Sequence, residues 1–419
     1  MFSDVRLSLP VLELSFKSDR MSEPVAQSEH CGFDFVVHQC NLIAAITNMT
    51  KYISLILCFI FASPFAVAQD TAKIRQSIGK GIAFLRATQS GAGSWDTPRT
   101  RIGPTTIVLA GLLDAGVGID DPMIVAGLKF VLASVAEDGG IYTPDGLLQN
   151  YETCCAVMCF AKANAAAKKK NGSEPYKELL TKAEKFLRDM QFTEERGVRP
   201  EDPQYGGIGY SAATRPDMSN VQFFLDALKA SGAKEDDPAI QKALVFVSRC
   251  QNLESEHNTM PFLKRNPDGL DGGFIYYPMP DPEGTRETEG LRSYGGMTYA
   301  GLKSMIYAGL TVEDKRFKAA LDWVSKNYTV TENPGRGAAG LYYYYQTMAK
   351  TLDVCNSPHL EDADGMKHNW RADLSEQLIS IQKANGSWTN ADSRQYMEDD
   401  ANLVTGYVLL TLSLCLSQE

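Results

Sequence analysis

The chain has 419 residues, of which 44% are hydrophobic and 22% charged, which is the composition of an ordinary globular protein. Its formal net charge of −10 makes nucleic acid and anionic lipid surfaces poor partners, because both repel an acidic protein. We therefore expect a protein that binds no nucleic acid.

The first 68 residues have the features of a leader rather than of a fold. Residues 1–48 show no sustained helical or alternating pattern. A short basic start at Met49-Thr-Lys51 then precedes an apolar run, Tyr52–Val67, which ends in Ala66-Val67-Ala68. These are the three parts of a secretory signal peptide, and the apolar run is short for a membrane span.

We therefore predict a signal peptide at 49–68, cleaved after Ala68, and interpret 1–48 as a wrongly included upstream extension of the reading frame. The mature protein would be one domain, 69–419, located in the periplasm or outside the cell. The alternative is a membrane anchor with a short cytoplasmic tail.

The mature part opens with a helix that ends in a glycine turn and a tryptophan. Lys80–Trp95 has an amphipathic pattern that must stop at Gly91 and Gly93. The Gln89 amide can satisfy backbone groups at the helix end, and Trp95 can shield those hydrogen bonds from water. A second copy lies near the C-terminus, at Gln382, Gly386 and Trp388.

This order of residues resembles the QW motif of the superfamily of squalene–hopene cyclases, oxidosqualene cyclases and protein prenyltransferases. The resemblance implies a structural role for six residues: Gln89, Gly93, Trp95, Gln382, Gly386 and Trp388. It also implies an (α/α)6 toroid and covers nearly all of the mature chain.

The sequence between the two copies repeats one unit, an amphipathic helix followed by a glycine- and aromatic-rich turn and a more apolar helix. Repeats of this size indicate a stacked or ring architecture. A helix that is apolar all round must be buried on all sides. The pattern thus predicts an all-α fold in which six outer helices surround six inner ones, with an open α-solenoid as the alternative.

The longest connections lead from an outer helix into an inner one, so they gather at one end of the ring. They are Thr193–Gln204, Asn252–Leu270 and Asp281–Gly290. Long loops at one end of a ring shape a pocket, and aromatic walls suit an isoprenoid chain. The candidate substrate-binding residues are Tyr151, Glu152, Tyr210, Asp217, Phe274, Tyr276 and Tyr294. The alternative is that the tyrosines only plug the ring.

Residues for catalysis are harder to find. Cyclases of this superfamily that protonate an alkene or epoxide carry Asp-x-Asp-Asp at the start of an inner helix, and this chain has no such motif. The nearest stretch is Glu398-Asp399-Asp400. Clustered acids can raise one another's pKa, so Asp399 or Asp400 is the candidate acid, although acids at a helix start are explained equally well as caps. We favour the cap.

We expect no metal and no cofactor. Cys355, His359, Asp362, Asp364 and His368 form a loop cluster, but their spacing matches no metal site. The six cysteines that follow the leader give no disulfide framework: Cys154, Cys155, Cys159, Cys250, Cys355 and Cys415. Packed thiols fit the first three, which share an apolar helix.

Three hypotheses follow. The first is an exported cyclase-like toroid that binds, and in one version cyclises, an isoprenoid or another apolar lipid, with membrane contact at the loop end. The second is a non-catalytic scaffold with a filled ring. The third is a polysaccharide-active enzyme with an open acidic groove. The oligomeric state is left open.

Overall fold

Two layers of helices follow from two kinds of helix sequence. The computed structural model describes residues 70–95, 97, 100–144, 146–265, 269–278 and 291–416. The predicted signal peptide and the segment before it lie outside these ranges. In the inner helix α3 every residue from Ile102 to Leu112 is buried, whereas the outer helix α6 buries only Ala183, Phe186, Leu187 and Met190.

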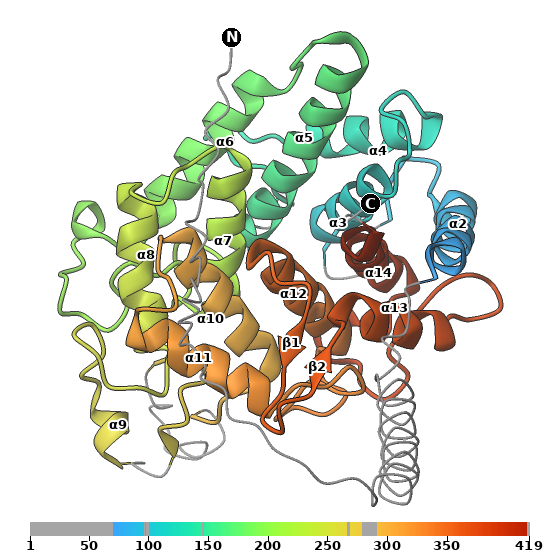
Figure 1. Cartoon of the computed structure of the whole chain (residues 1–419). Coiled ribbons are helices and arrows are strands. Elements are labelled where there is room, and N and C mark those ends of the chain that lie inside the picture. The colour runs from blue at the N-terminus through green and yellow to red at the C-terminus, as the bar shows by residue number, and fades with distance from the viewer. Residues whose placement is uncertain are drawn as a thin grey trace, which may run out of the picture. The chain divides into compact units, whose positions relative to one another are not determined.

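The inner helices close into a ring. In chain order they are α3 (Ile102–Asp114), α5 (Gln149–Asn171), α7 (Met218–Ala230), α10 (Gly295–Tyr307), α12 (Leu341–Val354) and α14 (Ala401–Leu416). Each packs against the next, and α14 packs against α3, as Figure 1 shows. The predicted all-α toroid is therefore confirmed, and the open solenoid is not what the chain forms.

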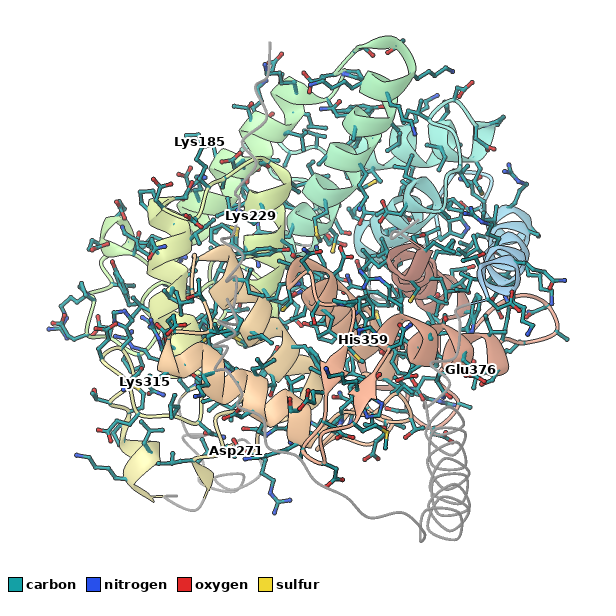
Figure 2. All side chains as sticks on the ribbon, viewed as in Figure 1. Lys185, Lys229, Asp271, Lys315, His359 and Glu376 are labelled. Atoms are coloured by element: carbon teal, nitrogen blue, oxygen red, sulfur yellow. The ribbon has the colours of Figure 1, made fainter. Side chains whose placement is uncertain are left out.

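The outer helices surround this ring. They are α2 (Thr71–Thr88), α4 (Pro122–Leu132), α6 (Lys177–Met190), α8 (Pro238–Arg249), α11 (Lys315–Lys326) and α13 (Trp370–Ser380). Their outward faces are charged, so Lys185, Lys315 and Glu376 lie at the periphery in Figure 2 and are exposed to solvent. Such polar faces belong to helices that bury one side only.

Short elements fill the connections. A 3-10 turn η1 (Glu194–Arg196) and the helix α9 (Pro261–Arg265) lie in two of the long loops. The strands β1 (Leu360–Glu361) and β2 (Lys367–His368) form a small antiparallel ribbon, and a second 3-10 turn, η3 (Gln395–Met397), precedes α14. Within the described ranges no helix is both long and apolar enough to cross a membrane.

Aspartate caps and ion pairs join successive outer helices. Asp121 caps α4 by accepting a hydrogen bond from the backbone of Met123, and Asp237 caps α8 in the same way. Each aspartate also binds an arginine from the preceding outer helix, Arg86 in α2 or Arg188 in α6. Each cap thus sets a helix start and ties that helix to its neighbour.

Four glutamines form a second kind of tie between successive outer helices, and all four use the same pair of hydrogen bonds. The Nε2 of Gln89, Gln191, Gln251 and Gln382 donates both to a turn glycine carbonyl and to a carbonyl of the next outer helix. The turn acceptors are Gly93, Gly206, Gly272 and Gly386, and the helix acceptors are Met123, Ala239, Arg316 and Ser77. Because Gln382 binds α2, the last outer helix is tied to the first.

No other amino acid fits at the glycine positions of these ties. All four have positive φ, and a Cβ on any of them would lie within 3 Å of the next outer helix. The tryptophans of the two predicted copies are buried, and each indole N–H donates at 2.8 Å to a carbonyl ten residues earlier, Trp95 to Leu85 and Trp388 to Leu378. The indoles therefore hold the ends of α2 and α13.

All six cysteines of the described residues are free thiols. Cys154, Cys155 and Cys159 are packed inside α5, as expected, and burial raises the pKa of all three.

Candidate functional site

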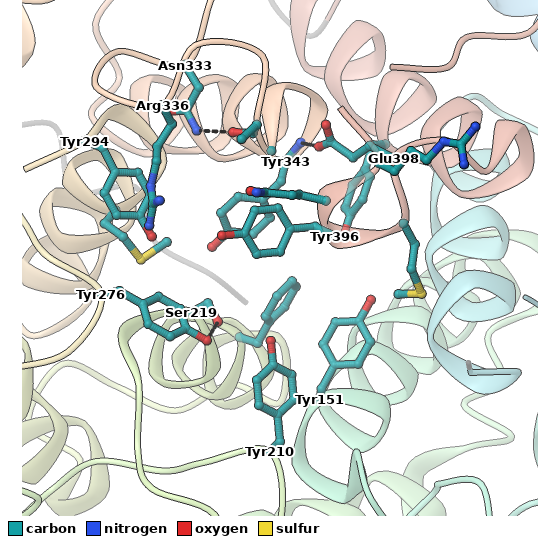
Figure 3. Close-up of a pocket in the computed structure, with 18 of the residues that line it drawn as sticks. Tyr151, Tyr210, Ser219, Tyr276, Tyr294, Asn333, Arg336, Tyr343, Tyr396 and Glu398 are labelled. Atoms are coloured by element: carbon teal, nitrogen blue, oxygen red, sulfur yellow. Dashed lines mark hydrogen bonds between the residues drawn. The ribbon is translucent and has the colours of Figure 1, made fainter. Parts of the chain in front are cut away.

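A cavity of about 860 Å³ lies at the end of the ring where the inner helices begin. Its wall comes from the first turns of these helices and from the turns that precede them. The lining residues are Leu148, Tyr151, Tyr210, Ser219, Phe223, Tyr276, Tyr294, Met297, Asn333, Arg336, Ala339, Gly340, Tyr343, Arg394, Gln395, Tyr396, Met397, Glu398 and Tyr407. Figure 3 shows the tyrosine rings surrounding an open space, so the ring is not filled at this end.

The interior wall is aromatic and tightly packed. The rings of Tyr151 and Phe223 meet edge to face with centroids 5.2 Å apart, and Phe223 lies 6.0 Å from Tyr343. Burial raises the pKa of the Tyr151, Tyr343 and Tyr407 phenols well above the usual range, so these hydroxyls stay neutral at physiological pH. The interior therefore presents ring faces and neutral hydroxyls.

The rim of the cavity is polar and carries two cations. Arg336, Arg394, Gln395 and Tyr396 are exposed, in contrast to the buried rings below them. The guanidinium carbon of Arg336 lies 4.7 Å from the centroid of the Tyr294 ring. The cavity thus has an apolar interior and a positively charged mouth.

The short segment Arg394–Glu398, here called the rim strap, has unusual backbone geometry. Tyr396 and Met397 have φ of 59° and 62°, two consecutive non-glycine residues in the left-handed region. This conformation costs of order 1 kcal/mol for each residue, so the contacts around the strap must enforce it. A Cβ on Gly340 would contact the Tyr396 ring, which shows that this ring packs on the start of α12.

Glu398 is the one carboxylate among the lining residues that the structure describes. It is fully buried, and burial raises its pKa. Its Oε1 accepts from the backbone N–H groups of Tyr342 and Tyr343, and its Oε2 accepts from the Asn390 amide. Oε1 therefore caps the start of α12, and Oε2 holds the loop residue Asn390.

The two candidate acids lie outside the cavity lining. Asp399 is exposed, and Asp400 accepts a hydrogen bond from the backbone of Leu403, which caps α14. Burial raises the pKa of Asp400, but Asp400 is not among the residues that line the cavity. The favoured interpretation of these acids as helix-start residues agrees with this geometry.

Of the seven candidate substrate-binding residues, Tyr151, Tyr210, Tyr276 and Tyr294 line the cavity and three do not. Glu152 is buried, accepts from both the backbone N–H and the hydroxyl of Thr143, and also binds the Thr100 hydroxyl. It joins two turns of the chain.

Asp217 caps α7 and lies one layer behind the wall. It accepts from Asn220 and from the Ser219 hydroxyl, and Ser219 itself lines the cavity. Phe274 is fully buried, with its ring in the space that a side chain on Gly301 would occupy. The sequence places Phe274 in the turn before an inner helix, but it does not show whether the Phe274 ring points into the cavity or into the core.

Part of the cavity lining could not be predicted from the sequence. Of the run Tyr342–Tyr345 only Tyr343 lines the cavity. Tyr344 and Tyr345 are buried elsewhere and donate to the carbonyls of Thr329 and Val330 in the loop after α11. Phe223, Met297 and Tyr407 lie on inner helices whose apolar pattern hides which side faces the centre. Arg336 and the rim strap had no sequence signal that we could interpret.

The loop cluster considered for metal binding forms a smaller contact. His368 Nε2 lies 2.9 Å from Asp362 Oδ2. No group of three or more His, Cys, Asp or Glu side chains placed for a metal ion occurs among the described residues.

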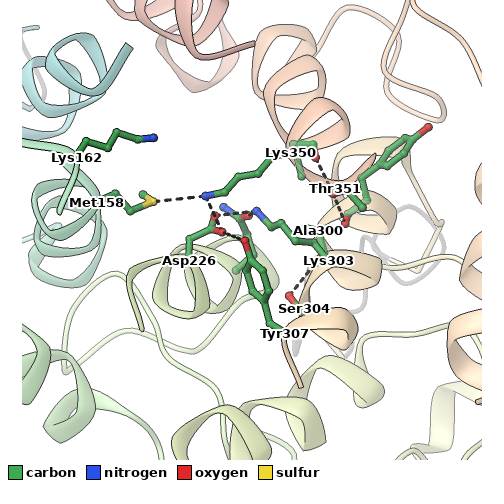
Figure 4. A network of polar contacts seen from close by, with 12 residues as sticks. Met158, Lys162, Asp226, Ala300, Lys303, Ser304, Tyr307, Lys350 and Thr351 are labelled. Carbon is green, nitrogen blue, oxygen red and sulfur yellow. Dashed lines mark hydrogen bonds and ion pairs between the residues drawn. The ribbon is translucent and has the colours of Figure 1, made fainter. Parts of the chain in front are cut away.

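A buried ion network lies toward the other end of the same ring, where the inner helices end (Figure 4). Asp226 of α7 binds Lys303 of α10 at 2.7 Å, Lys350 of α12 at 2.8 Å and the Tyr307 hydroxyl at 3.0 Å. A small cavity of about 80 Å³ adjoins it, and Phe223 and Tyr407 line both cavities. These two rings therefore separate the aromatic cavity from the ion network.

Comparisons with known proteins assign no family. No family model matches the chain, and no curated protein matches it. Among solved structures, the type II terpene cyclase MstE from Scytonema is 13% identical, with 82% of this chain and 98% of that chain covered and a TM-score of 0.47. A protein from Actinoplanes is 13% identical, with 82% and 100% covered and a TM-score of 0.46.

A variant of the Scytonema enzyme in complex with geranylgeranyl dihydroxybenzoate, its substrate, is 11% identical, with 82% and 98% covered and a TM-score of 0.31. Because these similarities are low, the fold and the site rest on the geometry of this chain itself.

Proposed function

We propose that this protein binds an isoprenoid or a similarly shaped apolar ligand in the tyrosine-walled cavity. The observation that carries the proposal is the cavity itself, about 860 Å³ in volume and lined inside by Tyr151, Phe223, Tyr294, Met297 and Tyr407. Cavities of this size take small organic ligands, and burying a hydrocarbon chain against rings is favourable by area.

A scaffold with a filled ring fits this geometry less well than a binding protein does. Apolar rings that face water in a cavity of this size are unfavourable by area, and a ligand that covers them removes that cost. A side chain as large as Tyr343 turns into the cavity although its neighbours Tyr344 and Tyr345 pack in the core. The open cavity therefore favours binding.

A polysaccharide-active enzyme would need two carboxyl groups facing one space. Only Glu398 faces the cavity among the described acidic residues, while Glu152, Asp217 and Asp399 lie elsewhere. The aromatic rings here surround a cavity that is open at one end, rather than forming platforms along a groove. The third hypothesis thus lacks its catalytic pair.

Binding is also better supported than proton-initiated cyclisation. A donor to an alkene must face the cavity and hold a proton that it can release. Glu398 faces the cavity, but backbone N–H groups and Asn390 donate to both of its oxygens, an arrangement that suits a carboxylate. Neither Asp399 nor Asp400 lines the cavity. The proposal is therefore a binding protein with a cyclase-like architecture.

Export is part of the proposal and rests on the sequence alone. The tripartite run from Met49 to Ala68 would send residues 69–419 across a membrane. N-terminal sequencing of the protein recovered from its cell envelope should find Gln69 first. A mature chain that starts before Met49 would exclude this part of the proposal.

The test of the binding function is mass spectrometry of lipids that co-purify with the protein. Wild type should carry an isoprenoid or another apolar lipid. Ala339→Trp should lose it, because residue 339 lines the cavity and an indole there fills the space. Ala338→Trp is the matched control, since residue 338 does not line the cavity. The same lipid on all three proteins, or none on wild type, would contradict the proposal.

A further inference from the structure

We propose that the ligand has an anionic head group, a carboxylate or a phosphate, which the Arg336 guanidinium binds at the cavity mouth while the apolar tail lies inside. This inference rests on the proposed function, because it concerns the same cavity. It adds the chemical class of the ligand and the residue that recognises it.

The first observation is where Arg336 lies. It belongs to the turn between Asn333 and Gly340, and its guanidinium lies over the ring of Tyr294. Figure 3 shows the side chain reaching from this turn toward Tyr294 at the edge of the cavity. The guanidinium contacts both the ring and the hydroxyl of Tyr294, and the rest of its five N–H donors remain available for a planar anion.

The second observation is what Arg336 lacks. No carboxylate in the described part of the chain pairs with Arg336 or with Arg394, the other rim cation. Some arginines elsewhere in the ring form ion pairs, as Arg86 does with Asp121 and Arg188 with Asp237. Glu398, the one lining carboxylate described, already accepts from three donors. The mouth is thus positive in a chain whose net charge is −10.

The third observation is that the Arg336 turn is held in place before any ligand binds. Asn333 accepts from the backbone of Gly296 at the start of α10 and donates to the carbonyl of Ala339. The backbone of Arg336 also donates to Asn333. A preorganised cation loses less entropy when it binds an anion, which raises affinity.

The arrangement as a whole separates charge from apolar surface. The guanidinium lies at the exposed mouth, and buried rings and Met297 lie below it. A neutral hydrocarbon would use the interior and leave the cation unused. A soluble anion would use the cation and leave the interior empty. An amphiphile with an acidic head uses both.

The test compares three probes with the same tail: geranylgeranoic acid, geranylgeranyl phosphate and geranylgeraniol. Calorimetric titrations at low salt would measure the affinity of each for the mature protein. At least one anion should bind more tightly than the alcohol, and its affinity should fall as salt is added. Which anion binds more tightly distinguishes a carboxylate head from a phosphate head.

Arg336→Gln should lose about ten- to a hundredfold in affinity for that anion and little for the alcohol, because it removes one charge-assisted contact. Arg336→Lys should lose less. The matched control is Arg215→Gln, since the Arg215 guanidinium also lies over a tyrosine, Tyr277 at 4.2 Å, but outside the cavity. It should bind all three probes as wild type does.

Two results would overturn the inference. If the alcohol binds wild type as tightly as both anions, or if Arg336→Gln weakens all three probes equally, the head group is not recognised, although the proposed binding function stands. If none of the probes binds wild type, the proposed function fails as well. The salt dependence on wild type decides the question even if Arg336→Gln does not fold.

Discussion

At the scale of single residues, the glutamine ties show what local sequence can and cannot reveal. In the two copies found in the sequence, the glutamine and its glycine are four residues apart. In the two copies that were missed, Gln191 and Gln251, the glycine lies 15 and 21 residues away, beyond a long loop. The contact is the same, but loop length removed the spacing that made it recognisable.

These ties predict a difference between two substitutions. Gln191→Ala should lower the free energy of unfolding by about 2 kcal/mol, because the Gly206 and Ala239 carbonyls lose a buried donor. Gln89→Ala should cost about 1 kcal/mol or less, because Gln89 is half-buried and water can replace its amide. Chemical denaturation measures both, and equal costs would refute the burial argument.

The buried lysine of the ion network predicts a pH dependence. Burial lowers the pKa of Lys303 to about 8, from 10.5 in the unfolded chain. Between about pH 8 and pH 10.5 the unfolded state therefore binds more protons, so this group makes the protein more stable as the pH rises. Below about pH 8 Lys303 is protonated in both the folded and the unfolded state, so this stabilisation is absent there.

Lys303→Met is the variant that isolates this effect, because Asp226 keeps Lys350 and Tyr307 as partners. The stability of wild type relative to the variant should rise by up to about 1.4 kcal/mol per pH unit across this window. Denaturation at several pH values measures it. If the stability difference between wild type and variant stays constant or falls as the pH rises, burial does not lower the pKa of Lys303.

At the scale of elements, the sequence predicts the helices, but it predicts only some of the side chains with which they line the cavity. The repeated pattern gave the inner and outer layers, because a buried helix is apolar all round. The turns before inner helices also pointed to Tyr210, Tyr276 and Tyr294, which line the cavity. The apolar pattern of α7 and α14 does not show which side of each helix faces the centre of the ring. Phe223 and Tyr407 were therefore not predicted as lining residues.

The rim strap is the element with the least sequence signal. Nothing in Arg394–Glu398 marks a left-handed turn, which is usually built from glycine or asparagine. The strap is held against the start of α12 by two of its own residues, the Tyr396 ring beside Gly340 and the Glu398 carboxylate, which accepts from Tyr342. Its geometry thus depends on these contacts within the closed ring and not on a local turn sequence.

The strained backbone leads to a prediction. Tyr396→Gly should change stability little or raise it, because glycine relieves the φ of 59° and offsets the lost ring contact. Gln395→Gly, at the neighbouring position where φ is not positive, should lower stability by about 0.5–1 kcal/mol. Thermal unfolding compares the two. If Tyr396→Gly costs more than Gln395→Gly, the strap is not strained there.

At the scale of the whole molecule, one ring holds two unlike spaces. The ends where inner helices begin surround the aromatic cavity, and the ends where they finish hold the network around Asp226. The helix C-termini carry partial negative charge, so lysines at that end are well placed. Phe223 and Tyr407 divide the two spaces, which confines a ligand tail to the aromatic side.

The central claim is that the tyrosine-walled cavity binds an isoprenoid-like chain, and direct titration of the mature protein with geranylgeraniol tests it most directly. Wild type and Ala338→Trp should bind the alcohol with equal affinity, and Ala339→Trp should bind at least tenfold more weakly, because its indole occupies the space of the tail. Equal binding by all three proteins, or no binding by wild type, would contradict the account.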